Sequence, residues 1–230
     1  MKYSLVIFDW DGTLIDSEAR IIASMQAAGR DVQWPDPLSD EAVRNIIGLG
    51  LPEAIRELCP GISGDLVEQV RQRYSHHFLE VSELGMPLFE GVLEGLQRLK
   101  DAGCTLAVAT GKSRRGLDRG FRDTGLGRMF RTSRCADETK SKPDPLMLNE
   151  LLKETGFSVH EAVMVGDTEF DLGMAENAGM DRIAVTYGAH HPDRLKVYQP
   201  IYTAHKFMDL IDWILASAAN ANSTINGVKS

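Results

Sequence analysis

Two aspartates one residue apart, Asp9 and Asp11, directly follow the hydrophobic stretch 5–8 near the N-terminus. Four consecutive hydrophobic residues are typical of a strand that is buried on both faces of a parallel sheet. In open α/β sheets, ligands bind beyond the carboxyl ends of the strands. Two carboxylates this close raise each other's pKa unless a positive charge lies between them. The pair therefore predicts a hard divalent cation, or a proton held by one carboxylate, at this edge of the sheet.

A simpler interpretation is a turn that leads into a helix, since aspartate and glycine are ordinary turn residues. An EF-hand calcium loop that began at Asp9 would need glycine at its sixth position and glutamate at its twelfth. Those positions hold Leu14 and Arg20, which excludes an EF-hand. The choice between a turn and a reactive site depends on the rest of the chain.

Polar residues follow two later hydrophobic stretches in the same way. Thr110 and Gly111 come after the stretch 105–109, and Asp167 comes after the stretch 162–165. Lys142 lies in the polar segment before the helix that is predicted at 145–155. Carboxylates for Mg²⁺, amides at a helix start and a lysine suit a phosphoryl group together, and a carboxylate can attack phosphorus. Their joint occurrence in chain order indicates phosphoryl chemistry.

The elements that must position these residues fall into two groups. Between residues 16 and 85, hydrophobic residues recur at helical spacing, which predicts four helices and no strand. From residue 86 onward, predicted strands and helices alternate, as they do in a parallel sheet. The sequence therefore predicts an α/β fold with a sheet core of residues 1–15 and 86–216 and an inserted helical lid of residues 16–85. The small polar tail 217–230 is predicted to be disordered.

The composition excludes several classes of partner. A formal net charge of −8 argues against binding to the phosphate backbone of nucleic acids. We expect no membrane span, because the longest hydrophobic stretches are too short, and no leader segment. Three widely spaced cysteines without a CxxC motif predict reduced thiols in a cytoplasmic protein. The sequence makes no prediction of the oligomeric state.

The polar residues at the strand ends resemble the ordered motifs of the haloacid dehalogenase superfamily. Residues 9–14 are similar to its first motif, DxDGT, and residues 166–171 to its fourth, GDxxxD. Residues 110–111 and 142–143 match the second and third motifs. The resemblance extends to about residue 215 and implies a Rossmann-like core. The helical insertion resembles the α-helical cap of the subgroup that contains phosphoglycolate phosphatase, pyrophosphatase and β-phosphoglucomutase.

The resemblance implies a role for each matching residue. Asp9 would be the nucleophile that forms an aspartyl-phosphate, and Asp11 would be the general acid and base. Lys142 would stabilise charge at the phosphoryl group, which Thr110 and Gly111 would bind. The implied Mg²⁺ ligands are Asp9, the backbone carbonyl of Asp11, Asp167 and, directly or in support, Asp171.

Two further residues are candidates for substrate binding from their positions in the sequence. Lys112 directly follows the Thr110–Gly111 pair and is close enough to assist it. Arg44 lies in the helical insertion, where a positive charge would help a lid to close over a phosphate. A surface position suits Arg44 equally well.

Together these features predict a Mg²⁺-dependent phosphatase that hydrolyses a small phosphate ester, with phosphoglycolate as the leading candidate. Other phosphorylated sugars, pyrophosphate and nucleotides stay open. A β-phosphoglucomutase-like phosphotransferase also stays open, because it would share the core motifs. A non-enzymatic phospho-receiver uses aspartate, threonine and lysine on a parallel sheet too, but it lacks a large insertion after its first strand. The presence of Asp11 disfavours dehalogenases, and the absence of lysine from residues 16–85 disfavours phosphonoacetaldehyde hydrolases.

Overall fold

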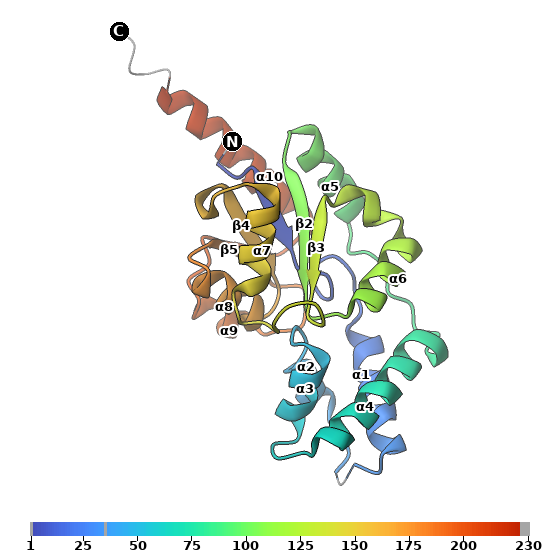
Figure 1. Cartoon of the computed structure of the whole chain (residues 1–230). Coiled ribbons are helices and arrows are strands. Elements are labelled where there is room, and N and C mark those ends of the chain that lie inside the picture. The colour runs from blue at the N-terminus through green and yellow to red at the C-terminus, as the bar shows by residue number, and fades with distance from the viewer. Residues whose placement is uncertain (1, 35, 226–230) are drawn as a thin grey trace.

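Strand β1 lies at the centre of a parallel sheet with the order β3-β2-β1-β4-β5-β6 (Figure 1). The computed structural model describes residues 2–34 and 36–225, with side chains up to residue 217. All four residues of β1 are buried, as expected for a strand with neighbours on both sides and helices on both faces. The strands are β1 (Leu5–Phe8), β2 (Thr105–Thr110), β3 (Thr132–Cys135), β4 (Ala162–Gly166), β5 (Asp181–Val185) and β6 (Tyr202–Ala204).

Alternate residues of the central strands contribute to two hydrophobic layers. Val6 and Phe8 pack with helices α5, α6 and α10 on one face, whereas Leu5 and Ile7 pack with α7 and α8 on the other. The helices and helical turns of this body are α5 (Val92–Asp101), α6 (Arg114–Thr124), η2 (Leu126–Met129), α7 (Leu146–Thr155), η3 (Val159–Glu161), α8 (Glu169–Asn177), α9 (Pro192–Lys196) and α10 (Phe207–Ile225).

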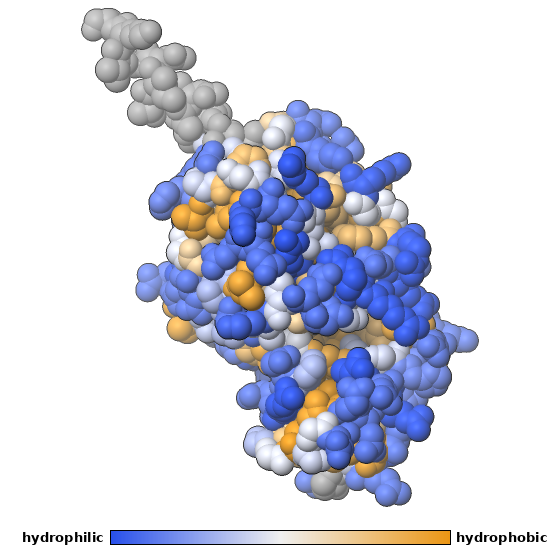
Figure 2. All heavy atoms as spheres, viewed as in Figure 1, coloured by the Kyte–Doolittle hydropathy of each residue, from blue (hydrophilic) through white to orange (hydrophobic). Residues whose placement is uncertain are grey.

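The segment between β1 and α5 folds into a separate helical body, which we call the cap (Figure 1). Its helices enclose a hydrophobic core of their own, with buried residues from α1, α3 and α4. Figure 2 shows mostly hydrophilic surface on this face of the cap, with a strip of hydrophobic surface between polar flanks. The cap elements are α1 (Glu18–Asp31), α2 (Asp40–Arg44), α3 (Leu51–Leu58), α4 (Gly64–His76) and the π-helical turn η1 (His77–Val81).

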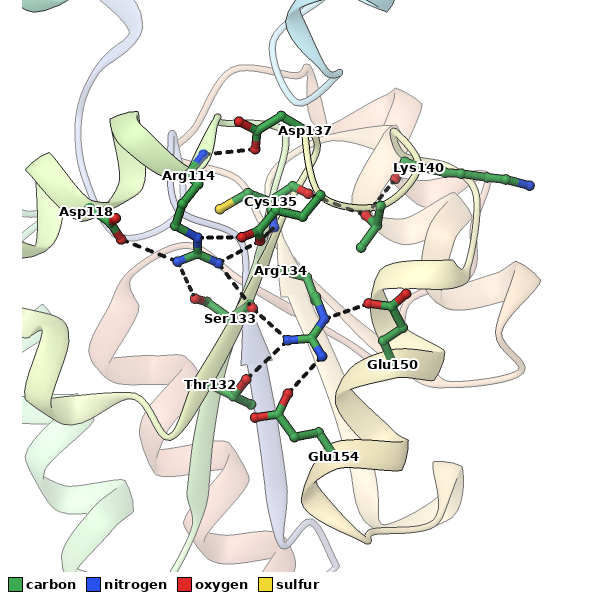
Figure 3. A network of polar contacts seen from close by, with 12 residues as sticks. Arg114, Asp118, Thr132, Ser133, Arg134, Cys135, Asp137, Lys140, Glu150 and Glu154 are labelled. Atoms are coloured by element: carbon green, nitrogen blue, oxygen red, sulfur yellow. Dashed lines mark hydrogen bonds and ion pairs between the residues drawn. The ribbon is translucent and has the colours of Figure 1, made fainter.

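Two arginines fix the segment that leads from β3 to Lys142 (Figure 3). Arg114, at the start of α6, donates to the Ser133 hydroxyl at 2.9 Å and to Glu138 at 2.8 Å. Its hydrogen bonds to Glu138 lower the pKa of that carboxyl group. Arg134 of β3 donates to Glu150 of α7 at 2.6 Å. These ion pairs tie α6, β3 and α7 together around a polar loop.

The parallel α/β fold that the sequence predicts is confirmed, with differences at the edges. The edge strands β3 and β6 span only four and three residues. Strands this short carry too little periodicity to be recognised. The predicted tail begins at residue 217, but α10 continues to Ile225, through alanines that favour helix. The rest of that tail, 226–230, lies outside the described residues.

Every helix in the described part of the chain is too short or too polar to cross a membrane.

Arg20 of α1 is a buried cation that fixes the end of the cap. Its guanidinium donates to the carbonyl oxygen of Phe78 at 2.9 Å and to that of Leu84 at 3.1 Å.

We expect Arg20→Met to lower the free energy of unfolding by about 1–3 kcal/mol, because a buried carbonyl loses its donors. Denaturant unfolding and hydrogen exchange over residues 77–84 would measure this. The matched variant Arg30→Met, on an exposed position of α1, should have little effect; equal losses in both variants would contradict the prediction.

Candidate active site

The carboxyl ends of β1, β2 and β4 bring the predicted residues to one edge of the sheet. Asp9 follows β1, and its N–H donates to the carbonyl oxygen of Val165 in β4 at 2.9 Å. Thr110 is the last residue of β2, and Asp167 directly follows β4. Strand order, rather than nearness in sequence, therefore assembles the site.

A buried cluster of carboxylates lies at this edge. Asp9, Asp167 and Asp171 each place one oxygen within 4.8 Å of the others. The Lys142 ammonium bridges two of them, at 2.6 Å from Asp9 Oδ1 and 2.6 Å from Asp171 Oδ1. The Lys142 side chain has an exposed fraction of 0%. Water therefore does not screen these charges, and their interactions are strong.

Burial and charge in the cluster together raise the pKa values of Asp9, Asp167 and Lys142. Burial raises the pKa of Asp9 well above its usual value, and the charges of Asp171 and Asp167 add to the rise against the effect of Lys142. Burial and the Asp171 charge raise the pKa of Asp167 to about 7. Burial alone would lower the pKa of Lys142, but Asp171 and Asp9 raise it overall. Three ionised carboxylates beside one ammonium would carry an excess of negative charge, so Asp9 and Asp167 hold a proton more readily than usual unless a cation binds them.

Glycines allow the backbone to approach Asp167 closely. Gly12 has φ +81°, and a Cβ on it would lie 2.2 Å from Asp167 Oδ2. A Cβ on Gly188 would lie 2.3 Å from the same oxygen. The two Asp167 oxygens instead accept hydrogen bonds from the Thr13 hydroxyl at 2.7 Å and the Ala189 N–H at 2.8 Å.

The donor set fits a magnesium ion. Asp9 Oδ2 is buried and has no hydrogen-bond partner in the described part of the chain, which is costly unless a cation binds it. Oxygen ligands alone suit Mg²⁺. Both Asp171 oxygens already accept from protein donors, Lys142 on one side and the N–H and hydroxyl of Thr168 on the other. One Asp171 oxygen thus faces a cation and the other accepts two donors, whereas each Asp167 oxygen accepts one neutral donor, which favours a supporting role for Asp171.

Asp11 points to a different set of partners. Its carboxylate accepts from the Ser17 hydroxyl at 2.7 Å and from the Lys112 ammonium at 3.0 and 2.8 Å. The same ammonium lies 4.4 Å from the centre of the Phe78 ring in the cap. Ser17 precedes α1, but its hydroxyl makes no cap bond to that helix and instead orients Asp11. No sequence pattern indicates that contact.

A cavity of about 220 Å³ lies between the cap and the sheet edge. Its lining includes five of the predicted residues: Asp9, Asp11, Thr110, Gly111 and Lys112. Arg44 is not among the lining residues, and its guanidinium pairs with Glu18 at 2.8 Å. A substrate contact by Arg44 stays a prediction, which this geometry does not favour.

The cap lies directly on Gly111. A Cβ at Gly111 would lie 2.5 Å from the carbonyl oxygens of both Gly48 and Leu49. The N–H of Gly50 donates to the Ser141 hydroxyl of the sheet body at 2.7 Å. The turn 48–50 thus closes one side of the cavity.

Residues 6–185 match the haloacid dehalogenase-like hydrolase family. The chain belongs to this family. "Probable phosphatase IndB" of Dickeya dadantii (strain 3937) is 36% identical over 211 residues, which cover 90% of this chain and 91% of that protein. A phosphoglycolate phosphatase of Vibrio vulnificus (strain YJ016) is 29% identical over 94% of this chain and 98% of its own. The crystal structure of a haloacid dehalogenase-like hydrolase from Bacteroides fragilis has a TM-score of 0.85 and 25% identity, over 91% of this chain and 100% of that one.

Membership of this family confirms that the protein is an enzyme, a hydrolase with relatives named as phosphatases. It also confirms the resemblance that the four motifs indicated.

Gly111→Ala tests the contact between the cap and the sheet body. Because the added methyl group would collide with two backbone carbonyls, we expect the cap to be held away and kcat/KM to fall by about 10²-fold. Gly64→Ala is the control, since a Cβ there meets no atom within 4 Å. An unchanged kcat/KM in Gly111→Ala would contradict the closed position of the cap.

The raised pKa of Asp167 predicts a pH dependence of stability. Between the unfolded value near 4 and the folded value of about 7, the folded state binds more protons. The free energy of unfolding should therefore fall as the pH rises from about 4 to 7. Thermal unfolding in EDTA would measure this fall, and Mg²⁺ should reverse it at pH 7 by binding the folded state. Asp167→Asn should lose its share of the fall and weaken the response to Mg²⁺, while Asp9, whose pKa is also raised, retains a smaller fall; a variant that responds like the wild type would contradict the assignment.

Proposed function

We propose that the protein is a Mg²⁺-dependent phosphatase that hydrolyses a small phosphate ester through an aspartyl-phosphate on Asp9. The observation that carries this proposal is the pair of oxygens on Asp9. Lys142 binds Oδ1, and Oδ2 is buried without a partner among the described residues, next to the cavity that Asp11 also lines. One carboxylate is thus oriented by a cation on one side and available to metal and phosphorus on the other.

In the first step, an oxygen of Asp9 attacks phosphorus as the bond to the leaving oxygen breaks. Asp11 donates a proton to that oxygen, so an alcohol leaves. Thr110 and Gly111 bind the phosphoryl oxygens at the start of α6, where backbone N–H groups favour anions. Bound Mg²⁺, held by Asp9, Asp167 and the carbonyl of Asp11, would neutralise phosphoryl charge.

In the second step, Asp11 takes a proton from water as the water oxygen attacks phosphorus. The bond between phosphorus and Asp9 breaks, which releases inorganic phosphate and restores both carboxyl groups. Ser17 and Lys112 orient Asp11 in both steps. Lys142 holds Asp9 in place throughout.

The leading substrate predicted from the sequence, phosphoglycolate, has the support of the name of the Vibrio vulnificus relative. A pyrophosphatase would also act on a substrate with a second anionic group, whereas a mutase would act on a hexose phosphate. The partner that we propose is a small-molecule phosphate ester, and the cytoplasmic location stays a prediction.

Asp11→Asn separates the two steps. General acid–base groups contribute about 10²–10⁴ in rate, so turnover should fall by that factor. With an aryl phosphate, whose leaving group needs little protonation, the first step should survive better than the second. The variant should then accumulate phosphorylated Asp9, visible by mass spectrometry of the intact protein.

Asp9→Asn in the same background is the control and should abolish the adduct. Rapid phosphate release by Asp11→Asn without any adduct would instead indicate direct attack by water and would refute the proposed intermediate. A mutase would form the adduct but would release little phosphate from hexose phosphates in its wild-type form.

A further inference from the structure

The part of the cavity wall that the cap contributes is largely hydrophobic. Met25 from α1, Ile47 from the turn after α2, Leu51 from α3 and Tyr74 from α4 line it, together with Phe78 from η1. Each of the cap's long helices thus contributes an apolar side chain to the space that the leaving group would occupy. Such a wall favours the burial of an apolar group and penalises an unpaired polar one.

Two aromatic rings give this wall a flat region. Tyr74 and Phe78 are stacked, with ring centroids 5.6 Å apart and an interplanar angle of 23°. Phe78 also lies over the Lys112 ammonium that binds Asp11. Because aromatic side chains favour flat aromatic partners, a ring on the substrate would fit here beside the proposed general acid.

The charges in the lining disfavour an acidic leaving group. Arg71 and Lys112 are the cations among the lining residues of the described chain, and both are already paired. Arg71 donates to Glu68 at 2.7 and 2.6 Å, and Lys112 donates to Asp11. Glu53 and Asp137 add negative charge to the lining. A carboxylate or a second phosphate on the substrate would therefore meet repulsion from Glu53 and Asp137, and it would gain a positive partner only by drawing Arg71 away from Glu68, with which Arg71 forms an exposed pair.

We propose that the cavity selects phosphate monoesters of uncharged alcohols that carry one aromatic or similarly flat hydrophobic group. The proposal rests on the phosphatase function proposed above and departs from phosphoglycolate as the substrate. A cavity of about 220 Å³ lies below the range of roughly 300–1,000 Å³ for drug-sized ligands. A leaving group of about the size of a single ring is accordingly the one that we expect to fit inside it.

Two matched pairs of esters test the charge and the shape separately. Benzyl phosphate and 4-carboxybenzyl phosphate differ in one carboxylate on the ring. Ethyl phosphate has a methyl group in the position where phosphoglycolate has a carboxylate. We expect kcat/KM for benzyl phosphate to exceed the values for 4-carboxybenzyl phosphate and ethyl phosphate by about tenfold or more. Ethyl phosphate should in turn be a better substrate than phosphoglycolate.

A charge added to the hydrophobic wall should change this preference. Leu51 is only half-buried, so Leu51→Lys places an ammonium in the lining without burying it fully. The ratio of kcat/KM for 4-carboxybenzyl phosphate to that for benzyl phosphate should rise by about tenfold. Leu93→Lys, on an exposed position of α5, is the matched control and should leave the ratio unchanged.

If the cavity instead prefers an acidic leaving group, Arg71 is the lining residue that we expect to bind it. If phosphoglycolate is turned over about tenfold better than ethyl phosphate, and Arg71→Gln removes that advantage, the inference is wrong. Hydrolysis of p-nitrophenyl phosphate separates this result from failure of the proposed function. If that ester is hydrolysed while the benzyl and carboxybenzyl esters react equally, the inference alone is refuted. If the protein hydrolyses none of these esters in Mg²⁺, both proposals are refuted.

Discussion

The buried ammonium of Lys142 is the interaction on which the site depends. It lies between Asp9 and Asp171, with Asp167 close by, and all four side chains are buried. One positive charge among three carboxylates leaves the cluster short of positive charge, and a divalent cation would supply it. Removing one partner from a buried ion pair typically costs about 3–5 kcal/mol. The arrangement that makes these groups costly to bury is the one that a bound divalent cation would stabilise.

The sheet makes this concentration of charge possible. β1 pairs with β2 on one side and β4 on the other, so residues from distant parts of the chain end at the same edge. Each strand is held by backbone hydrogen bonds and two hydrophobic layers, which leaves the strand ends little freedom to move apart. Gly12 and Gly188 complete the arrangement, because a side chain at either position would overlap Asp167. The carboxylates are held together by the fold rather than by attraction.

The sequence was most informative where a strand that is buried on both faces ends in polar residues. That pattern predicted the parallel sheet and placed Asp9, Thr110 and Asp167 together. It could not predict contacts made by side chains across the fold. The pairing of Arg44 with Glu18 depends on how two cap helices pack. The bond from Ser17 to Asp11 depends on the path of the segment that joins β1 to α1. Neither the helix packing nor the path of that segment follows from local periodicity.

The geometry links the identity of the leaving group to the chemistry at Asp11. Phe78 is held by Arg20 through its carbonyl and in turn lies over Lys112, which binds Asp11. A leaving group that packs against Phe78 would therefore lie beside the carboxyl group that must protonate it. Because Phe78 belongs to the cap and Asp11 to the sheet body, the two side chains lie near each other only while the cap contacts the sheet body. In the mechanism that we propose, substrate selection and general acid catalysis would thus depend on the same closed position of the cap.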